Sequence, residues 1–361
     1  MDIYAAALSG MAKLGAKRIR GLVTYFGSAE KVWRASTADI LEAEVLSSAM
    51  AAKLYDYTHS TDLDRLAREL REKNVSVLTW QEEGYPPLLK ETANPPAVLF
   101  YRGAKPVWEK TIAIVGARKA TAYGVNAAKA IAEGLGREGV TIVSGGARGI
   151  DTIAHEGCLL GGAPTAAVLA CGLDVTYPPE NRNLFQKICD AGGTLLSEYP
   201  LGTEPLGRQF PARNRIIAGM TRGVVVTEAA MRSGSLITAD FALEEGRDVF
   251  SVPGSIWSAM SKGTNHLIRN GAICATGAGD ILSEYGWNEE KTEESKKIKT
   301  EELTLEEEMV YRFCCTGDTV SGEDLLVQSG FTVPKLTMIC LSLTMKGYIR
   351  EAGAGLYAAC K

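Results

Sequence analysis

The sequence lacks the patterns that mark a disulfide framework, a structural metal site or a membrane segment. Its eight cysteines include no CxxC pair, and their spacing does not match that of zinc ligands. The opening residues, MDIYAAALSGMAKLG, are too polar for a secretory signal, and no apolar run approaches the length of a membrane-spanning helix. We therefore expect a soluble, cytoplasmic protein with mostly buried thiols and no bound metal or cofactor.

An excess of positive charge is also missing. The 361 residues include 39 Lys and Arg and 43 Asp and Glu, for a formal net charge of −4. This balance excludes the cationic surface of a histone-like protein, so any nucleic-acid binding has to come from a local basic patch. A chain of this length is expected to form two or three domains.

Neither the GxGxxG motif nor the GxxxxGK[ST] P-loop is present, but one Gly-rich turn has the chemistry of a phosphate site. It comprises Gly145, Gly146, Ala147, Arg148 and Gly149. An apolar run precedes it, and a helix is predicted to begin near Gly149 with Asp151 in its first turn. Glycines leave amide groups accessible to a ligand, and Arg148 adds a cation beside them.

Short apolar runs alternate with helix-length amphipathic segments between residues 73 and 286. The main runs predicted to be strands are 75–78, 112–115, 141–143, 165–169, 193–196, 224–226 and 248–252. Continuous hydrophobicity indicates burial on both faces of the sheet. The sequence therefore predicts a Rossmann-like α/β domain with a mostly parallel sheet, in which ligands bind beyond the carboxyl ends of the strands.

Gly, Ser or Arg residues follow five of these strands, and we expect them to converge on one rim. The segments are 116–119, 144–151, 171–182, 227–238 and 253–255. A single glycine can simply permit a bend, but five such segments in succession favour a common binding site. Arg213 and Arg215 are expected in a nearby helix, roughly 200° apart around its axis. One can bind phosphate while the other braces a carboxylate such as Glu198 or Glu228; the sequence does not decide which.

Residues 1–72 are predicted to form a small helical domain of the SAM-like or helix-hairpin-helix type. Residues 14–22 have apolar residues at helical spacing, and residues 25–28 follow them; glycines interrupt the helical pattern in both segments. Two interpretations stay open: the hairpin contacts a DNA backbone, or the helices pack as a bundle against the next domain.

A charged linker is predicted at 287–302, followed by a winged-helix domain at 303–361. Its predicted elements are helices at 305–314, 321–328 and 333–345 and a hairpin formed by 347–350 and 355–358. The recognition helix carries only Lys335 and Lys346, a weak footprint for duplex DNA. Two interpretations of this domain stay open: it binds another protein, or it binds DNA.

The central domain resembles the DNA processing protein A family (DprA, also called Smf). The motifs that carry this resemblance are VGARKATAYG (115–124), SGGARGID (144–151), GLDVTYPPENRNL (172–184), FPARNRIIAGM (210–220), the segment 224–254, and GTNHLIRNGA (263–272). The resemblance implies a single-stranded DNA-binding protein of natural transformation. Such a protein protects incoming DNA, loads the RecA recombinase and works as a homodimer, without a known catalysed reaction.

The resemblance also implies a set of DNA-binding residues. They are Arg118, Gly145, Gly146, Ala147, Arg148, Gly149, Asn181, Arg182, Arg213, Ser233, Gly234 and Ser235, with Arg208 as a further cation. Amides and arginines of this kind bind successive phosphates without reading bases. Glu180 departs from the more basic loop expected beside Arg182.

The competing interpretation is an enzyme, a nucleoside-monophosphate phosphoribohydrolase of similar fold. The loop of that enzyme class carries a glutamate that assists glycosidic cleavage, whereas this chain has Thr238 at the corresponding place. Glu228 could substitute, although a carboxylate there more often supports a helix or an arginine. His155, on the helix after the Gly-rich turn, is expected to serve packing or to lie at the surface.

Overall fold

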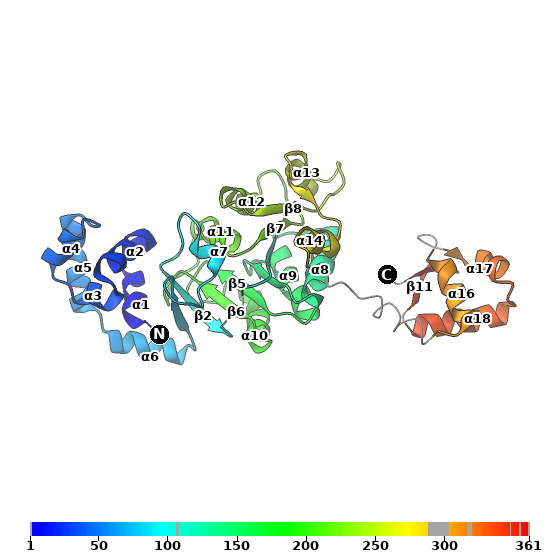
Figure 1. The fold of residues 1–361 in the computed structure, drawn as a ribbon, viewed down its shortest axis with the longest axis horizontal. Helices are drawn as coiled ribbons and strands as arrows, with labels where there is room; N and C mark the ends of the chain where they lie inside the picture. Colours follow the sequence, from blue (N-terminus) through cyan, green and yellow to red (C-terminus); the bar gives the residue numbers. More distant parts are fainter. Residues whose placement is uncertain are drawn as a thin grey trace. The chain divides into compact units, whose positions relative to one another are not determined.

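The computed structural model describes residues 2–105, 108–287, 303–315, 320–346, 348–353 and 355–359. The chain divides into two compact units, Met1–Asn288 and Glu289–Lys361. Figure 1 shows the helices and strands of each unit. The predicted linker, except for its first residue, lies outside the described residues.

The first unit begins with six helices, as the sequence predicts for residues 1–72. They are α1 (Ile3–Gly10), α2 (Gly15–Phe26), α3 (Ala29–Arg34), α4 (Thr37–Glu42), α5 (Ser48–Ser60) and α6 (Leu63–Glu72). Side chains of Asp2, Ser28, Ser36 and Asp62 accept backbone N–H groups at four of the helix starts. Gly27 ends α2 in the left-handed conformation, at φ 87°.

A nine-stranded sheet follows. Its strands are β1 (Ser76–Thr79), β2 (Val98–Gly103), β3 (Thr111–Val115), β4 (Thr141–Ser144), β5 (Thr165–Leu169), β6 (Thr194–Ser197), β7 (Gly223–Val226), β8 (Asp248–Ser251) and β9 (Ile273–Cys274). The spatial order is β1-β2-β6-β5-β4-β3-β7-β8-β9. The pairs β1–β2 and β2–β6 are antiparallel, and the other neighbouring pairs are parallel. The prediction of a Rossmann-like, mostly parallel sheet is confirmed.

Helices cover both faces of the central strands (Figure 1). Ile112 and Ile114 of β3 pack in a core with α8 (Ala122–Arg137), α9 (Ile150–Leu160) and α14 (Ala278–Glu284). Ala113 and Val115 pack on the other side with α7 (Pro87–Lys90), α11 (Gln209–Gly219) and α12 (Gly234–Glu244). Burial on both sides explains why the strands are apolar at consecutive positions.

The helical region and the sheet share one hydrophobic core. Buried Leu8 and Leu22 belong to the same cluster as Val77 and Phe100, and α10 (Arg182–Asp190) contributes Phe185 to it. The secondary structure therefore changes type near the predicted boundary at residue 73, while the two parts pack as one compact unit.

The described part of the second unit contains three helices and a small sheet. The elements are α16 (Leu305–Cys314), β10 (Val320–Ser321), α17 (Gly322–Ser329), α18 (Val333–Met345), β11 (Ile349–Gly353) and β12 (Leu356–Ala359). The three strands pair antiparallel in the order β10-β12-β11. This element order is the one that the winged-helix prediction requires; the identification as a winged helix stays a prediction.

Lys335, in α18, and Lys346, directly after it, are both paired with acidic side chains of α16. Lys335 pairs with Glu306 at 2.5 Å, and Lys346 pairs with Glu307 at 2.9 Å. Their charges are thus balanced within the unit. Among the described residues, no single helix is long and apolar enough to span a membrane. Helix α17 and residues Val333–Thr344 of α18, bent by 112°, pass that test of length and composition as a pair.

Candidate nucleic-acid interface

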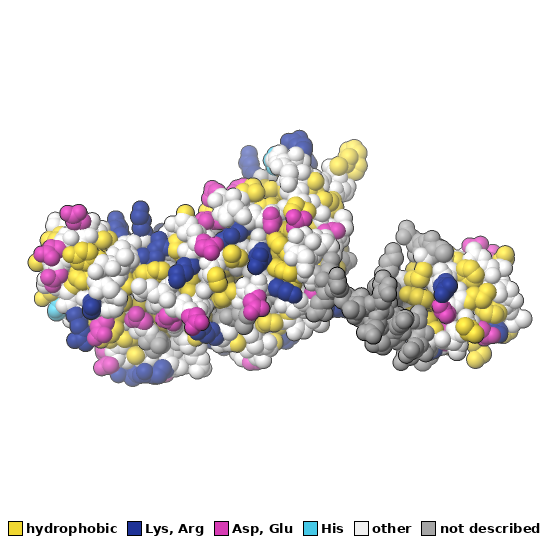
Figure 2. All heavy atoms as spheres, in the orientation of Figure 1, with side chains coloured by type: hydrophobic (Ala, Val, Ile, Leu, Met, Phe, Trp, Pro, Cys, Tyr) yellow, Lys and Arg dark blue, Asp and Glu magenta, His cyan; other side chains and the backbone are white. Residues whose placement is uncertain are grey.

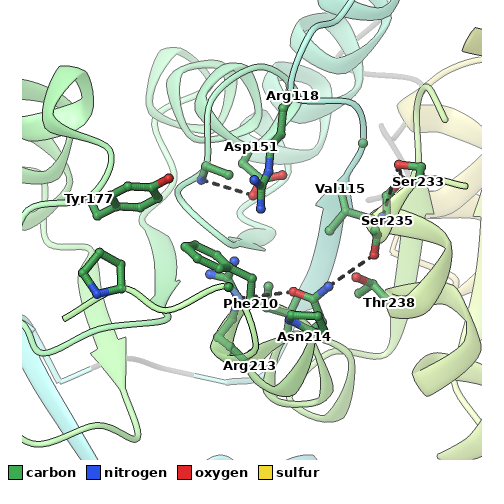
Figure 3. A pocket seen from close by; sticks show the side chains of 17 residues that line it. Val115, Arg118, Asp151, Tyr177, Phe210, Arg213, Asn214, Ser233, Ser235 and Thr238 are labelled. Carbon is green, nitrogen blue, oxygen red and sulfur yellow. Dashed lines mark hydrogen bonds between the residues drawn. The ribbon is translucent and has the colours of Figure 1, made fainter. Parts of the chain in front are cut away.

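A cavity of about 590 Å³ opens at the carboxyl ends of β3, β4 and β7 (Figure 3). The chain continues from β3 to β4 on one side, whereas β7 lies on the other side of β3, so the cavity marks the topological switch of the sheet. The predicted site residues that line it are Arg118, Ala147, Arg213, Ser233, Gly234 and Ser235. Tyr177 and Thr238, from segments expected at the rim, line it as well, and so do Phe210 and Asn214; none of the four was among the predicted DNA-binding residues.

Glycine conformations and hydrogen bonds from Asn181 fix the backbone of the Gly-rich turn. Gly146 and Gly149 adopt φ of 63° and 78°, and a Cβ on Gly149 would collide with the carbonyl oxygen of Ala117. The buried Asn181 donates from Nδ2 to the carbonyl oxygen of Gly146 and to Thr152 Oγ1, both at 2.9 Å. Asn181 therefore supports the turn through its amide, and the turn follows β4 as predicted.

Arg213 and Asp151 are both buried in the floor of the cavity. The side chain of Arg213 is 3% exposed, and Nη1 donates to the carbonyl oxygen of Gly145 at 2.6 Å and to that of Val168. Asp151 accepts the backbone N–H of Ala147 at 3.2 Å. Burial raises the pKa of Asp151 although the nearby Arg213 opposes that rise, and burial lowers the pKa of Arg213 to about 10. Arg213 thus joins two strand ends under the cavity.

Arg215 is the arginine that braces a carboxylate. It forms an ion pair with Glu198, directly after β6, and donates from Nη1 to the carbonyl oxygen of Asn94 at 3.0 Å. Burial raises the pKa of Glu198, and the charge of Arg215 opposes that rise. The sequence left open which arginine pairs with Glu198 or Glu228. In the structure, Arg215 pairs with Glu198.

A cation and two aromatic rings form one wall of the cavity. The exposed Arg118 lies with its guanidinium carbon 5.1 Å from the centre of the Phe210 ring, and the Tyr177 ring centre is 5.4 Å from Phe210 (Figure 3). Such a stack orients a guanidinium while its outer edge stays free for hydrogen bonding. Phe210 could have been suspected from its place before Pro211 in a predicted arginine-bearing helix.

The other predicted cations lie outside the cavity lining. Arg148 is half-exposed and binds Glu180 through both Nη2, at 2.7 Å, and Nε, at 3.2 Å. The hydrogen bond from Arg148 lowers the pKa of Glu180. Arg182 and Arg208 are exposed, at the start of α10 and directly before α11. Neither has an ion-pair partner among the described residues.

The Ser233–Ser235 turn begins α12 on the opposite wall (Figure 3). The hydroxyl oxygens of Ser233 and Ser235 are 2.7 Å apart, and Ser233 Oγ accepts the backbone N–H of Ser235 at 3.3 Å. Asn214 donates from Nδ2 to the carbonyl oxygen of Gly234 at 3.3 Å, which ties this turn to α11. The wall offers hydroxyl groups and a helix N-terminus, both suited to an anion.

Glu228 supports a helix. It is 2% exposed and accepts the backbone N–H of Thr121 at 2.8 Å and its hydroxyl at 2.7 Å, just before α8 begins. Its carboxylate is thereby occupied. His155 is fully buried with Nδ1 2.7 Å from Thr165 Oγ1, so it serves packing, one of the two expected roles.

Comparisons with known proteins agree with the resemblance inferred from the motifs. The model of the family described as DNA recombination-mediator protein A matches residues 76–286. The chain is 40% identical to the Smf protein of Synechocystis sp. over 288 residues, 78% of this chain and 72% of that protein. It is 47% identical to the DNA processing protein DprA of Streptococcus pneumoniae over 205 residues, 56% of this chain and 72% of that protein.

Two solved structures are also similar. DNA processing protein A from Streptococcus pneumoniae matches with a TM-score of 0.69 and 38% identity, covering 78% of this chain and 96% of that one. DNA processing protein A from Helicobacter pylori, solved to address its single-stranded DNA binding mode, matches with a TM-score of 0.53 and 31% identity, covering 58% and 95%. The chain belongs to the DNA recombination-mediator protein A family, whose members include the DprA and Smf proteins.

Proposed function

We propose that this protein binds single-stranded DNA in the cavity at the carboxyl ends of β3, β4 and β7. The observation that carries the proposal is the exposed Arg118 stacked on Phe210 at the mouth of a cavity with a second arginine, Arg213, in its floor. Arg118 is placed to bind a phosphate, and the aromatic rings of Tyr177 and Phe210 offer faces to unpaired bases.

Each partner in this arrangement recognises a feature common to all nucleotides. Arginine and turn amides bind phosphate, and aromatic rings accept any base, so the proposed binding has little sequence preference. A duplex hides the faces of its bases, which favours a single strand as the ligand. The similar protein from Helicobacter pylori, whose structure concerns binding of single-stranded DNA, supports the same assignment.

The wider role that we propose follows from the family. The protein acts in the cytoplasm during natural transformation, where it protects incoming single-stranded DNA and loads RecA onto it, and it works as a homodimer. Membership in the DNA recombination-mediator family supports this role. Pull-down of RecA with the protein on single-stranded DNA, and the mass of the free protein in solution, test the partner and the dimer.

We also propose that the protein is not a phosphoribohydrolase. The supporting observation is that Glu228, the carboxylate that precedes the loop of that enzyme class, accepts two hydrogen bonds from Thr121 at the start of α8. We expect no release of free base from nucleoside monophosphates. Release that disappears in Glu228→Gln would instead establish the enzyme.

The experiment that tests DNA binding compares Arg118→Ala with Arg68→Ala. Arg68 is a matched control because it is an exposed arginine on α6, within the N-terminal helices. Fluorescence anisotropy with labelled oligothymidine at two salt concentrations should show about tenfold weaker binding for Arg118→Ala. The slope of log K against log salt should become shallower by about 0.7. Equal affinity and slope in the two variants would remove Arg118 from the site.

A further inference from the structure

Helix α2 and the turn that precedes it concentrate positive charge within the N-terminal helices. Residues 3–29 include four basic residues and no acidic one, whereas the whole chain has a formal net charge of −4. The four are Lys13, Lys17, Arg18 and Arg20. A chain with this overall charge has to bind nucleic acid through a local basic patch, and this stretch forms one that the proposed function has not used.

Three of the four cations are exposed. Lys13, Lys17 and Arg18 lie at the surface, and none of them forms an ion pair with a described residue. Arg18 donates from Nη1 to the carbonyl oxygen of Lys13 at 2.9 Å, which keeps these two residues together where α2 begins. Figure 2 shows Lys and Arg side chains gathered over α2. Their charges are therefore available to a ligand.

The exposed side of α2 takes no part in the hydrophobic core. Ile19, Leu22 and Val23 pack into the core that the helices share with the sheet. Tyr25, by contrast, is 54% exposed. It lies seven residues after Arg18, so both side chains are on one side of the helix, about 10 Å apart along its axis. Packing against the sheet thus explains the apolar residues of α2 but neither its cations nor this ring.

Helix α2 lies beside the helix that carries part of the proposed DNA site. Arg20 donates from Nη1 to the carbonyl oxygen of Pro95 at 2.7 Å, and Arg215 of α11 donates to that of Asn94 at 3.0 Å. Burial lowers the pKa of Arg20, and the nearby charge of Arg215 contributes to this lowering. Because α11 also carries Phe210, which lines the cavity, the basic surface is separated from the cavity by a single helix.

We propose that Lys13, Lys17, Arg18 and Tyr25, together called the α2 face, bind the part of a single DNA strand that extends beyond the cavity. The three cations pair with phosphates, and the Tyr25 ring stacks on an unpaired base. The inference rests on the proposed function. A single strand fits this face because it exposes phosphates and base faces together, as three cations and an aromatic ring require. Duplex DNA would leave the ring unmatched.

The test uses the full-length protein and two labelled oligothymidines, one of roughly 5 nucleotides to fill the cavity and one of roughly 16 to reach the α2 face as well. The triple variant Lys13→Gln/Lys17→Gln/Arg18→Gln should bind the long strand at least about fivefold more weakly. Its slope of log K against log salt should be shallower by about 2, because three phosphate contacts are lost. It should bind the short strand like the wild type.

The matched control is Arg65→Gln/Arg68→Gln/Arg71→Gln. It removes the same charge from three exposed arginines of α6 and should bind both strands like the wild type. Two single changes test the α2 face without the triple variant. Lys17→Glu and Tyr25→Ala should each weaken binding of the long strand, whereas Tyr25→Phe should keep it because a ring remains. Circular dichroism checks the fold of each variant.

Three outcomes would overturn the inference. The first is wild-type affinity and salt slope of the triple variant and of Lys17→Glu for the long strand. The second is an equal loss in the α6 control, which would make the effect one of net charge. The third is weaker binding of a duplex with single-strand affinity unaltered, which would make the α2 face a duplex site. Arg118→Ala separates the two proposals, because it should weaken binding of both strands. If it weakens neither, the cavity is not the DNA site.

Discussion

Arg148 and Glu180 form an exposed ion pair beside the Gly-rich turn, with two nitrogens of the arginine on one carboxylate oxygen. The arginine that follows the turn amides is therefore matched by an acidic side chain from the segment after β5. A phosphate that approaches Arg148 has to displace Glu180 or share the arginine with it. The pair thus limits how strongly this part of the rim attracts DNA.

Removing the carboxylate should strengthen DNA binding. In Glu180→Gln the guanidinium of Arg148 becomes available to a phosphate, so affinity for single-stranded DNA should rise and the salt slope should steepen by about 0.7. Anisotropy titrations at two salt concentrations measure both. Glu72→Gln, which removes an exposed negative charge on α6, is the control for net charge. Equal changes in the two variants would mean that Arg148 makes no phosphate contact.

Arg213→Met should destabilise the protein. The change removes hydrogen bonds to the carbonyl oxygens of Gly145 and Val168, and it removes the buried positive charge that favours the ionised form of Asp151. We expect the free energy of unfolding to fall by about 3 kcal/mol or more, measured by urea denaturation. Arg118→Met, at an exposed arginine, should lose DNA affinity while keeping its stability. Unchanged stability of Arg213→Met would show that the buried contacts of Arg213 are dispensable.

His155 should make stability depend on pH. Thr165 donates its only hydroxyl proton to Ile142, so His155 Nδ1 carries the proton that it shares with Thr165 and the buried Nε2 is left without a partner among the described residues. Burial lowers the pKa of His155 to about 3, below the usual 6.5. Between pH 3 and pH 6.5 the unfolded chain therefore binds one more proton, at His155, than the folded chain does. The contribution of neutral His155 to the free energy of unfolding is complete above pH 6.5 and is lost as the pH falls below that value.

The expected slope is up to about 1.4 kcal/mol per pH unit below 6.5. Urea denaturation between pH 7.5 and pH 5 measures it, in roughly half-unit steps. His155→Gln retains a hydrogen-bonding group without a titration in this range, so its stability should change less with pH than that of the wild type. Parallel curves for the two proteins would show that another group causes the dependence.

Deletion of residues 288–361 should leave DNA binding intact. All residues that line the proposed DNA site belong to the first compact unit. In the second unit, Lys335 and Lys346 are paired with Glu306 and Glu307. The truncated and full-length proteins should therefore show the same affinity and salt slope for single-stranded DNA. A folded truncation that no longer binds would transfer the site to the second unit.

The sequence predicts the central sheet well because strands buried on both faces are continuously apolar. It also predicts that the segments after β3, β4 and β7 lie together, since parallel strands end at the same edge. The first four residues of β2 (Val98–Gly103) are apolar or aromatic like the predicted strands, so the pattern could have revealed it. The two-residue β9 is too short for any periodicity.

The roles of individual arginines could not be predicted, because they depend on partners distant in sequence. Gly145 and Val168 lie 68 and 45 residues from Arg213, and only the folded sheet brings their carbonyl oxygens to one guanidinium. The stacking of Arg118 on Phe210 likewise joins the segment after β3 to α11. The local sequence pattern identified these arginines, but it did not show which of them are exposed to solvent.

The hydrophobic core common to the N-terminal helices and the sheet has a practical consequence for dissecting the protein. A fragment cut to the family-matched segment, 76–286, would expose apolar surface on β1 and β2 that α1 now contacts. Such a fragment is expected to aggregate, because newly exposed apolar patches are adhesive. The smallest well-behaved form of the DNA-binding part should therefore begin near residue 2, at the Asp2 cap of α1.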